Sequence, residues 1–267
     1  MSEKGEAMER FVIFVDGSNL FGALKSMSVE VDDYEALYGY VFKEARAAWL
    51  EATYQTQPVS CRLQRVYWYA VGSIDDWDLG LPQSQTALRN AFSRDREVHD
   101  SWVAITGKAD PALRGQELED KAWESCFADF TQWYEGKKRI LEGMRRFHQG
   151  IRLGTNLIDV KEQGHWKVNF LHKLVEEKGL DTSLAVDMVA LQDNYDTAVV
   201  VSGDADSIPS ILHIKSRGKH IAAVEFVNGS PSETKGRTFS SRLKGHADFV
   251  IRIYETELLR HMIGKRP

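Results

Sequence analysis

Acidic residues follow short apolar runs at two places in the sequence. Asp16 comes directly after the run at residues 11–15, in FVIFVDGSNLFG, and Asp204 and Asp206 come after the run at residues 198–201, in SGDADS. Carboxylates that share one place repel each other and raise each other's pKa unless a cation neutralises them. Hard oxygen ligands favour Mg²⁺ or Mn²⁺ over zinc. Such an ion keeps open positions for phosphate oxygens, which the hydrolysis of a phosphodiester requires.

Two further aspartates stand shortly before the second of these runs. Asp181 and Asp187 lie in EEKGLDTSLAVDM, within a segment that is predicted to be helical from about residue 183. A helix packed on a sheet buries apolar residues on its inner face, so the direction of the Asp187 side chain decides whether it does chemistry.

Each aspartate taken alone has a structural explanation. Asp16 closes a turn through its side chain in this view, Asp206 is the N-cap of a helix that tolerates Pro209 in its first turn, and Asp181 caps the helix at residue 183. These explanations lose weight only if the aspartates meet at one edge of a sheet.

The surrounding pattern predicts an α/β fold with a mostly parallel central sheet and helices on both faces, a three-layer α/β/α sandwich. The runs at 11–15 and 198–201 are apolar without alternation, which is typical of strands buried on both faces. Further strands are expected at 65–71, 150–158, 220–227 and 247–253, and helices at 33–53, 114–148, 183–193 and 207–216. In such sheets ligands bind beyond the carboxyl ends of the strands, where the strand order reverses.

The domain prediction is a single domain over residues 9–254, followed by a C-terminal tail at 255–267. Residues 73–135 break the alternation of strands and helices, with a short helix expected at 84–97 and turn signals in VAITGKADPALRG. This interval is predicted to be an insertion or an elaborated connection.

Composition excludes several classes of protein. No apolar run approaches the roughly 20 residues of a membrane span, and the polar N-terminus MSEKGEAMER has no signal region, so no membrane association is expected and the cytoplasm is the default location. The two cysteines and eight histidines show no zinc-ligand spacing.

The net charge of −5 hides two basic stretches. Residues 136–150 carry five cations against one acid, and residues 213–246 carry seven against two. Both are compatible with a path for a polyanion or with solvated faces. The cationic residues are Lys137, Lys138, Arg139, Arg145 and Arg146, then Lys215, Arg217, Lys219, Lys235, Arg237, Arg242 and Lys244.

Four stretches together resemble the NYN-domain family, and more closely its LabA-like branch, within the PIN-like nuclease superfamily. They are FVIFVDGSNLFG, EKGLDTSLAVDMVAL, VVVSGDADSIPSILHIKSRGK and SRLKGHADFVIRI. The resemblance spans residues 9–254 except the interval 73–135. It implies a metal-dependent nuclease, most often one that acts on RNA.

The resemblance also assigns residues. Asp16 matches the family's first-strand metal ligand and Asn19 the polar residue that orients it; the remaining motif aspartates are Asp181, Asp187, Asp204 and Asp206. Ser207 replaces the aromatic residue that usually follows the SGDxD motif. Ser202 would lie beside the site, and Lys178 would meet a phosphate or sit solvated at a helix end.

The resulting hypothesis is hydrolysis of RNA, favoured over DNA, with one or two Mg²⁺ or Mn²⁺ ions held by Asp16, Asp187 and Asp204 with Asp181 or Asp206. Exposed aromatic residues would stack on unpaired bases, unless they belong to the core; the candidates are Tyr67, Trp68, Tyr69, Trp77 and Trp102.

Other acidic sites fail on spacing. A topoisomerase-primase domain wants a glutamate on the first strand, a haloacid-dehalogenase-like phosphatase wants a second aspartate where Ser18 stands, and an integrin-type metal site wants a serine where Leu20 stands. A regulatory or RNA-binding protein that keeps the nuclease fold stays open. The oligomeric state is also open, with a homodimer as one option.

Overall fold

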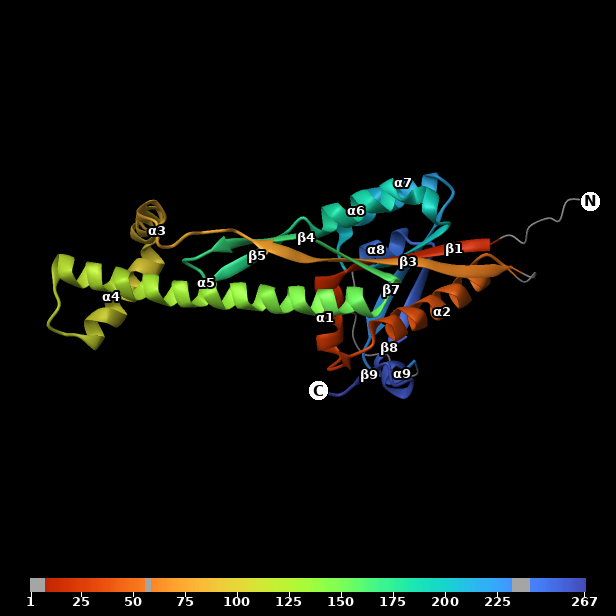
Figure 1. Cartoon of the computed structure of the whole chain (residues 1–267), viewed down its shortest axis with the longest axis horizontal. Helices are drawn as coiled ribbons and strands as arrows, with labels where there is room; N and C mark the ends of the chain where they lie inside the picture. The colour runs from red at the N-terminus through yellow and green to blue at the C-terminus, as the bar shows by residue number, and fades with distance from the viewer. Residues whose placement is uncertain (1–7, 56–58, 232–240) are drawn as a thin grey trace, which may run out of the picture. The chain divides into compact units, whose positions relative to one another are not determined.

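The computed structural model describes residues 8–55, 59–231 and 241–267, and it divides the chain into two compact units (Figure 1). The first, here called the sheet unit, comprises Met1–Ala70, His148–Gln163 and Gly179–Pro267. The second, here called the helical unit, comprises Val71–Phe147 and Gly164–Lys178.

The strands follow the order β5-β4-β3-β1-β6-β7-β8. Parallel pairing joins β1 to both β3 and β6, and then joins β6 to β7 and β7 to β8, whereas β4 and β5 are antiparallel. The strand bounds are β1 Met8–Asp16, β3 Ser60–Ile74, β4 Ile158–Asn169, β5 Leu174–Lys178, β6 Thr197–Val201, β7 His220–Val227 and β8 Phe249–Tyr254. The predicted α/β class with a mostly parallel sheet is confirmed.

Helices cover both faces of the sheet unit. Figure 1 shows α6 and α7 on one side of the strands and α1 and α2 on the other. The bounds are α1 Gly17–Ser26, α2 Tyr34–Ala52, α6 Leu180–Ala190, α7 Ile208–Ser216, α8 Ser241–His246 and α9 Glu255–Arg260, with short 3₁₀ turns η1 Gln192–Asn194 and η2 Ala205–Ser207. A small antiparallel pair joins β2, Glu30–Val31, to β9, Gly264–Lys265.

The centre of the sheet unit is β1. Its residues from Phe11 to Asp16 are all buried, because β1 lies between two parallel strands and beneath helices. Phe11 makes edge-on ring contacts with Phe42 and Trp49 of α2. A strand buried on both faces reads as a continuous apolar run, which explains why this segment was predictable.

The helical unit has its own core. Its helices are α3 Pro82–Arg94, α4 Arg96–Ala109 and the greater part of α5 Gly115–Gly154. Phe130 and Tyr134 of α5 pack on Phe170, which follows β4. In the described parts of the chain, no helix, α5 included, has an apolar stretch that would span a bilayer.

Three local predictions were wrong. The strand expected at 150–158 is largely the end of α5, which continues to Gly154, and β4 begins only at Ile158. The turn signals after residue 103 lie partly within α4. The turn that Asp16 is expected to close is instead the start of α1, whose first residue is Gly17, and a Cβ at Gly17 would collide with the Trp68 indole and the Tyr69 carbonyl.

An ion pair ties β1 to the segment that leads into β6. The Arg10 guanidinium donates to both carboxylate oxygens of Asp196 at 2.8 Å, and the Arg10 amide donates to Oδ2 at 3.0 Å. These bonds to Arg10 lower the pKa of Asp196 to about 2. Because the pKa is depressed in the folded state, the stabilisation is present above the unfolded pKa of about 3.9 and is lost as the pH falls towards 2.

We therefore expect Asp196→Asn to reduce the acid sensitivity of the fold. Between about pH 4 and pH 2 the wild type should lose on the order of 1–2 kcal/mol more free energy of unfolding than the variant. Urea unfolding at several pH values measures this difference. Glu51→Gln, on the exposed surface of α2, is the control and should keep the wild-type slope; equal slopes for all three proteins would refute the prediction.

Candidate functional site

The carboxyl ends of β1 and β6 lie side by side. Val15 of β1 pairs with Val201 of β6, so the next residues along the two strands, Asp16 and Ser202, leave the sheet at the same edge. On its other side β1 pairs with β3, where Asp16 is the register partner of Tyr69. The strand order reverses around β1, which is where open α/β sheets bind ligands.

Asp16 is both the last residue of β1 and the N-cap of α1. Its Oδ1 accepts a hydrogen bond from the Asn19 backbone amide at 3.0 Å, and its Oδ2 accepts one from the Asn19 side-chain amide. The side chain therefore caps a helix instead of closing a turn. The residue is only 2% exposed, and both bonds come from neutral donors.

Asp204 follows β6 and caps η2. Its Oδ1 accepts from the Asp206 amide at 3.0 Å, and its own amide donates to the buried Ser202 hydroxyl at 3.1 Å. Asp206 is exposed and does not cap α7, whose N-cap position is held by Ser207 with Pro209 in the first turn. The alternative in which Asp206 caps this helix is therefore excluded.

The Asp187 side chain of α6 contacts residues of strands β3 and β4. Its Oδ2 accepts from the Tyr69 hydroxyl at 2.8 Å and from the Lys161 ammonium at 2.6 Å. The Lys161 Nζ also lies 4.7 Å from the centre of the Tyr67 ring. Burial, and then the bond to Asp187, raise the pKa of the Tyr69 hydroxyl well above its usual range, so this hydroxyl remains a donor.

Lys161 is a candidate site residue that no sequence motif indicates. It lies on β4, where buried Ile158 and Val160 flank the polar Asp159. This alternation is typical of a strand, but the strand predicted at 150–158 ends before Lys161. The Lys161 side chain is about four-fifths buried and forms an ion pair with Asp187. Lysine side chains are rarely buried unless they are paired.

The other two predicted residues take different places. Asp181 lies in the first turn of α6, whose N-cap is Gly179 at φ 89°, so it does not cap a helix at residue 183. Contacts of α6 with β1 and η2 bring this helix to the same sheet edge. Lys178 is an exposed residue of β5 in the helical unit, where it pairs with Glu176 at 3.0 Å.

The donor set was compared with what a divalent ion needs. Nowhere in residues 8–55, 59–231 and 241–267 do three histidine, cysteine, aspartate or glutamate side chains gather closely enough to hold an ion among themselves. Mg²⁺, however, is commonly bound by one or two carboxylates, with waters and substrate phosphates completing its shell. Asp16 and Asp204 fit that need, because the hydrogen bonds that the described residues donate to their carboxylates come from neutral amides.

Several cationic side chains of the basic stretches already form ion pairs within the chain. Lys215 pairs with Asp248, Lys219 with Asp196 and Lys244 with Glu225. The predicted cations Lys235 and Arg237 lie outside the described residues, as does the side chain of Arg242.

The predicted stacking aromatics belong mainly to the cores. Trp68 and Tyr69 are fully buried in the sheet unit, and Trp77 and Trp102 pack against the core of the helical unit. Tyr67 is half-buried and stacks on Phe14.

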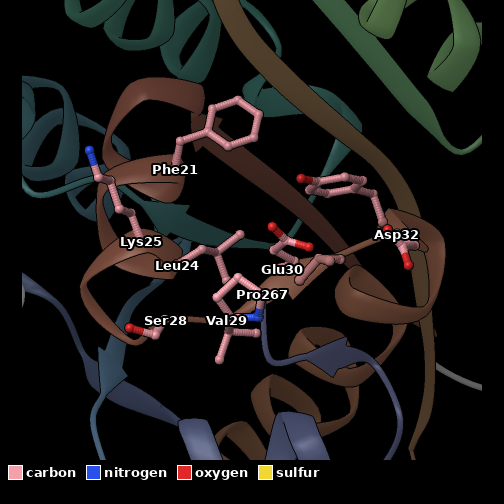
Figure 2. A pocket seen from close by; sticks show the side chains of 10 residues that line it. Phe21, Leu24, Lys25, Ser28, Val29, Glu30, Asp32 and Pro267 are labelled. Carbon is pink, nitrogen blue, oxygen red and sulfur yellow. The ribbon is translucent and has the colours of Figure 1, made fainter.

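A cavity of about 710 Å³ opens beside α1 and β2. Apolar side chains of Phe21, Leu24 and Val29 line it together with the charged Lys25 and Glu30. Figure 2 shows the Phe21 ring and the Glu30 carboxylate facing the same hollow. Phe21 is 36% exposed and lies five positions beyond Asp16, a rise of about 7.5 Å along the helix that Asp16 caps.

Comparison with known proteins bears on this site. Residues 140–243 match the NYN domain. The match covers less than half of the chain and includes the four aspartates of α6 and the β6–α7 connection, but not Asp16. It supports a place in the NYN/PIN-like superfamily. A crystal structure of a protein of unknown function from Vibrio parahaemolyticus is 15% identical, with a TM-score of 0.43 over 95% of this chain and 96% of that one. No curated protein matches the chain.

The pairing of Lys161 with Asp187 has a measurable consequence for stability. Lys161→Met removes the ammonium and leaves a carboxylate that is only 19% exposed without its counter-charge. We expect a loss of about 1–3 kcal/mol in the free energy of unfolding. Adding Asp187→Asn to Lys161→Met should recover most of that loss, because it removes the uncompensated charge.

Urea unfolding of the wild type, both single variants and the double variant completes this double-mutant cycle. Tyr69→Phe is the matched control, since it removes the other donor to the same oxygen but no charge. If the losses in the free energy of unfolding caused by Lys161→Met and by Asp187→Asn simply add in the double variant, the ion pair does not stabilise the site.

Proposed function

We propose that this protein is a divalent-metal-dependent nuclease of the LabA-like branch that hydrolyses single-stranded RNA. The observation that carries the proposal is the pair of aspartates at the end of β1 and after β6, where strand order reverses, with Asp16 buried and bonded, among the residues that the structure describes, to neutral amides alone. A buried carboxylate with no cation partner is unfavourable. A divalent ion shared with Asp204 would supply that partner.

In this proposal Mg²⁺ or Mn²⁺, when bound, supplies Lewis acidity and a nucleophilic water. Asp16 is held by Asn19 and by its place at the start of α1, so its carboxylate is oriented before substrate arrives. Asp204 is oriented by the Asp206 amide. Asp181 and Asp206 remain candidates for outer contacts to the ion or its waters.

Asp187 takes a different role from that of a simple ligand. Its Oδ2 already accepts two hydrogen bonds, one of them from Lys161. We propose that Asp187 positions the Lys161 ammonium at the same edge, where its charge would balance a substrate phosphate. The site is then a one-ion site with a built-in lysine, instead of a cluster of five carboxylates.

A second candidate is an RNA-binding or regulatory protein that keeps the fold without cleavage. The observation that favours it is the absence, within the described residues, of any group of three side chains able to hold an ion. The two functions differ in whether RNA is cut when Mn²⁺ is supplied.

Cleavage of single-stranded RNA by the purified chain should require Mg²⁺ or Mn²⁺. Asp16→Asn should reduce the rate at least about 100-fold while the protein stays folded, because asparagine is as good an N-cap as aspartate. Asp204→Asn should do the same. Glu51→Gln should cleave like the wild type. A wild type as inert as both variants, yet able to bind RNA, would overturn the nuclease and support the second candidate.

The cavity next to α1 would take an unpaired base of the same strand. The exposed face of Phe21 offers stacking, Glu30 can accept hydrogen bonds from an exocyclic amino group, and Lys25 adds a charge for the backbone. Asp32 is already engaged by Lys265 at 2.6 Å. Glu30 is therefore the carboxylate that we propose as the acceptor in this cavity.

Binding can be measured apart from cleavage in the Asp16→Asn background. Adding Phe21→Ala should weaken the affinity for a short single-stranded RNA about 5- to 100-fold, as expected for the loss of one stacked base. Phe21→Trp should retain the affinity. Leu212→Ala, an exposed apolar residue of α7, is the control. Equal affinities for Phe21→Ala and the control would exclude this cavity as a base site, whatever the catalytic result.

A further inference from the structure

Three side chains of the helical unit form a continuous hydrogen-bonded chain. Ser73 Oγ lies 2.9 Å from His165 Nδ1, and His165 Nε2 lies 2.6 Å from Asp75 Oδ1. Ser73 lies near the end of β3 and Asp75 directly follows that strand, while His165 lies on β4. None of them takes part in the site at the end of β1.

The positions of the protons on Ser73 and His165 follow from the ionisation state of the Asp75 carboxylate. The Val168 amide donates to Asp75 Oδ2 at 2.9 Å. Burial acts to raise the pKa of Asp75, but this bond and the one from His165 outweigh it, so the pKa is lowered and the carboxylate stays ionised. An ionised carboxylate only accepts hydrogen bonds, so His165 Nε2 must carry a proton.

The remaining proton positions in this series of hydrogen bonds then follow. In a neutral imidazole with a proton on Nε2, Nδ1 has a lone pair and can only accept. The Ser73 hydroxyl must therefore donate to Nδ1. Its other neighbour, the Gly164 carbonyl oxygen at 3.5 Å, is at the limit for a hydrogen bond. Ser73 Oγ is thus aligned to give its proton to His165 when it attacks an electrophile.

This is the order of roles that nucleophilic catalysis by serine requires: a nucleophile, a base, and a carboxylate that orients the base. The two ring nitrogens are exchanged relative to the usual serine hydrolase, but such sites are recognised by geometry and roles. The Asp75 amide also donates to the Trp166 carbonyl at 2.9 Å, so the backbone fixes the carboxylate relative to β4.

The neighbouring groups suit a small acyl ester. Lys178 is the direct cross-strand partner of His165, which places a cationic side chain on the same face of the sheet for charge that develops on a carbonyl oxygen. Val168, whose amide donates to Asp75, also lines a cavity of about 260 Å³ together with Trp77, Phe170 and the charged Lys167 and Glu176. The apolar side chains of this cavity could receive a short acyl or aryl group.

We propose that Ser73, His165 and Asp75 form a second, esterase-type catalytic site. Ser73 Oγ bonds to the ester carbonyl carbon while its proton passes to His165 Nδ1. The carbon–oxygen bond to the alcohol then breaks, and the alcohol leaves with that proton. Water then bonds to the acyl carbon while its proton passes to Nδ1. The bond between the acyl carbon and Ser73 Oγ breaks, the proton on Nδ1 returns to Oγ, and the carboxylic acid leaves.

A fluorophosphonate probe on the full-length protein tests this directly. Attack by Ser73 forms an oxygen–phosphorus bond and releases fluoride, and mass spectrometry of the labelled peptide locates the adduct. We expect labelling at Ser73 that is lost in Ser73→Ala and slowed at least about 100-fold both in His165→Gln and in Asp75→Asn. With p-nitrophenyl acetate, the wild type should release an initial burst of nitrophenol close to one per chain.

The controls separate chemistry from structure. Ser93→Ala, which removes a hydroxyl bonded to the Arg89 carbonyl in the same unit, should label like the wild type, and so should Asp16→Asn. A purely structural cross-strand network predicts a lower melting temperature for His165→Gln with no labelling of Ser73 in any protein. That result, or labelling of Ser73 that is unchanged by His165→Gln in folded protein, would overturn the proposal.

Discussion

The sheet unit depends on one buried strand that ends in a charge. Strand β1 is enclosed by β3 and β6 and by helices on both faces, and Asp16 stands at its end with 2% exposure. Capping α1 gives this carboxylate two amide donors from Asn19. Those bonds fix where α1 starts, and Gly17 lets the helix begin directly against Trp68. Moving Asp16 would therefore disturb the strand, the helix and the cavity beside Phe21 together.

The sequence predicted those parts of the fold in which one physical signal dominates. Residues 11–15 and 198–201 are apolar throughout, and residues 220–227 are apolar except for His220 and Glu225, because both faces of these segments are covered; all three are strands in the structure. The segment at 150–158 carried a mixed signal. Ile151 and Leu153 suggested a strand, but helix α5 simply continues through them to Gly154. Packing against the rest of the fold determines how far a helix continues. The local content of apolar residues does not reveal that packing.

Some candidate site residues could likewise be predicted from the sequence, and others could not. The aspartates at strand ends were visible because a charge that terminates an apolar run stands out. The pairing of Lys161 with Asp187, and of Ser73 with His165, joins residues 26 and 92 positions apart. No local pattern encodes such contacts, since they follow from which strands become neighbours. Capping roles were also misassigned for Asp181 and Asp206, because the true helix starts depend on backbone conformation at Gly179 and Ser207.

The acidic residues of the sheet unit show how charge is distributed between structure and chemistry. Asp196 is neutralised by Arg10, Asp187 by Lys161, and the nearly buried Glu225 by Lys244. Each of these carboxylates has a cationic side chain as its partner, and each ties together elements that are distant in sequence. Asp16 is as deeply buried as any of them, but within the described residues its bonds come only from amides, which orient a negative charge without cancelling it. In this part of the chain the other buried acids have cationic partners and Asp16 has neutral donors, so a cation from outside the chain would be electrostatically favourable at the strand-order reversal.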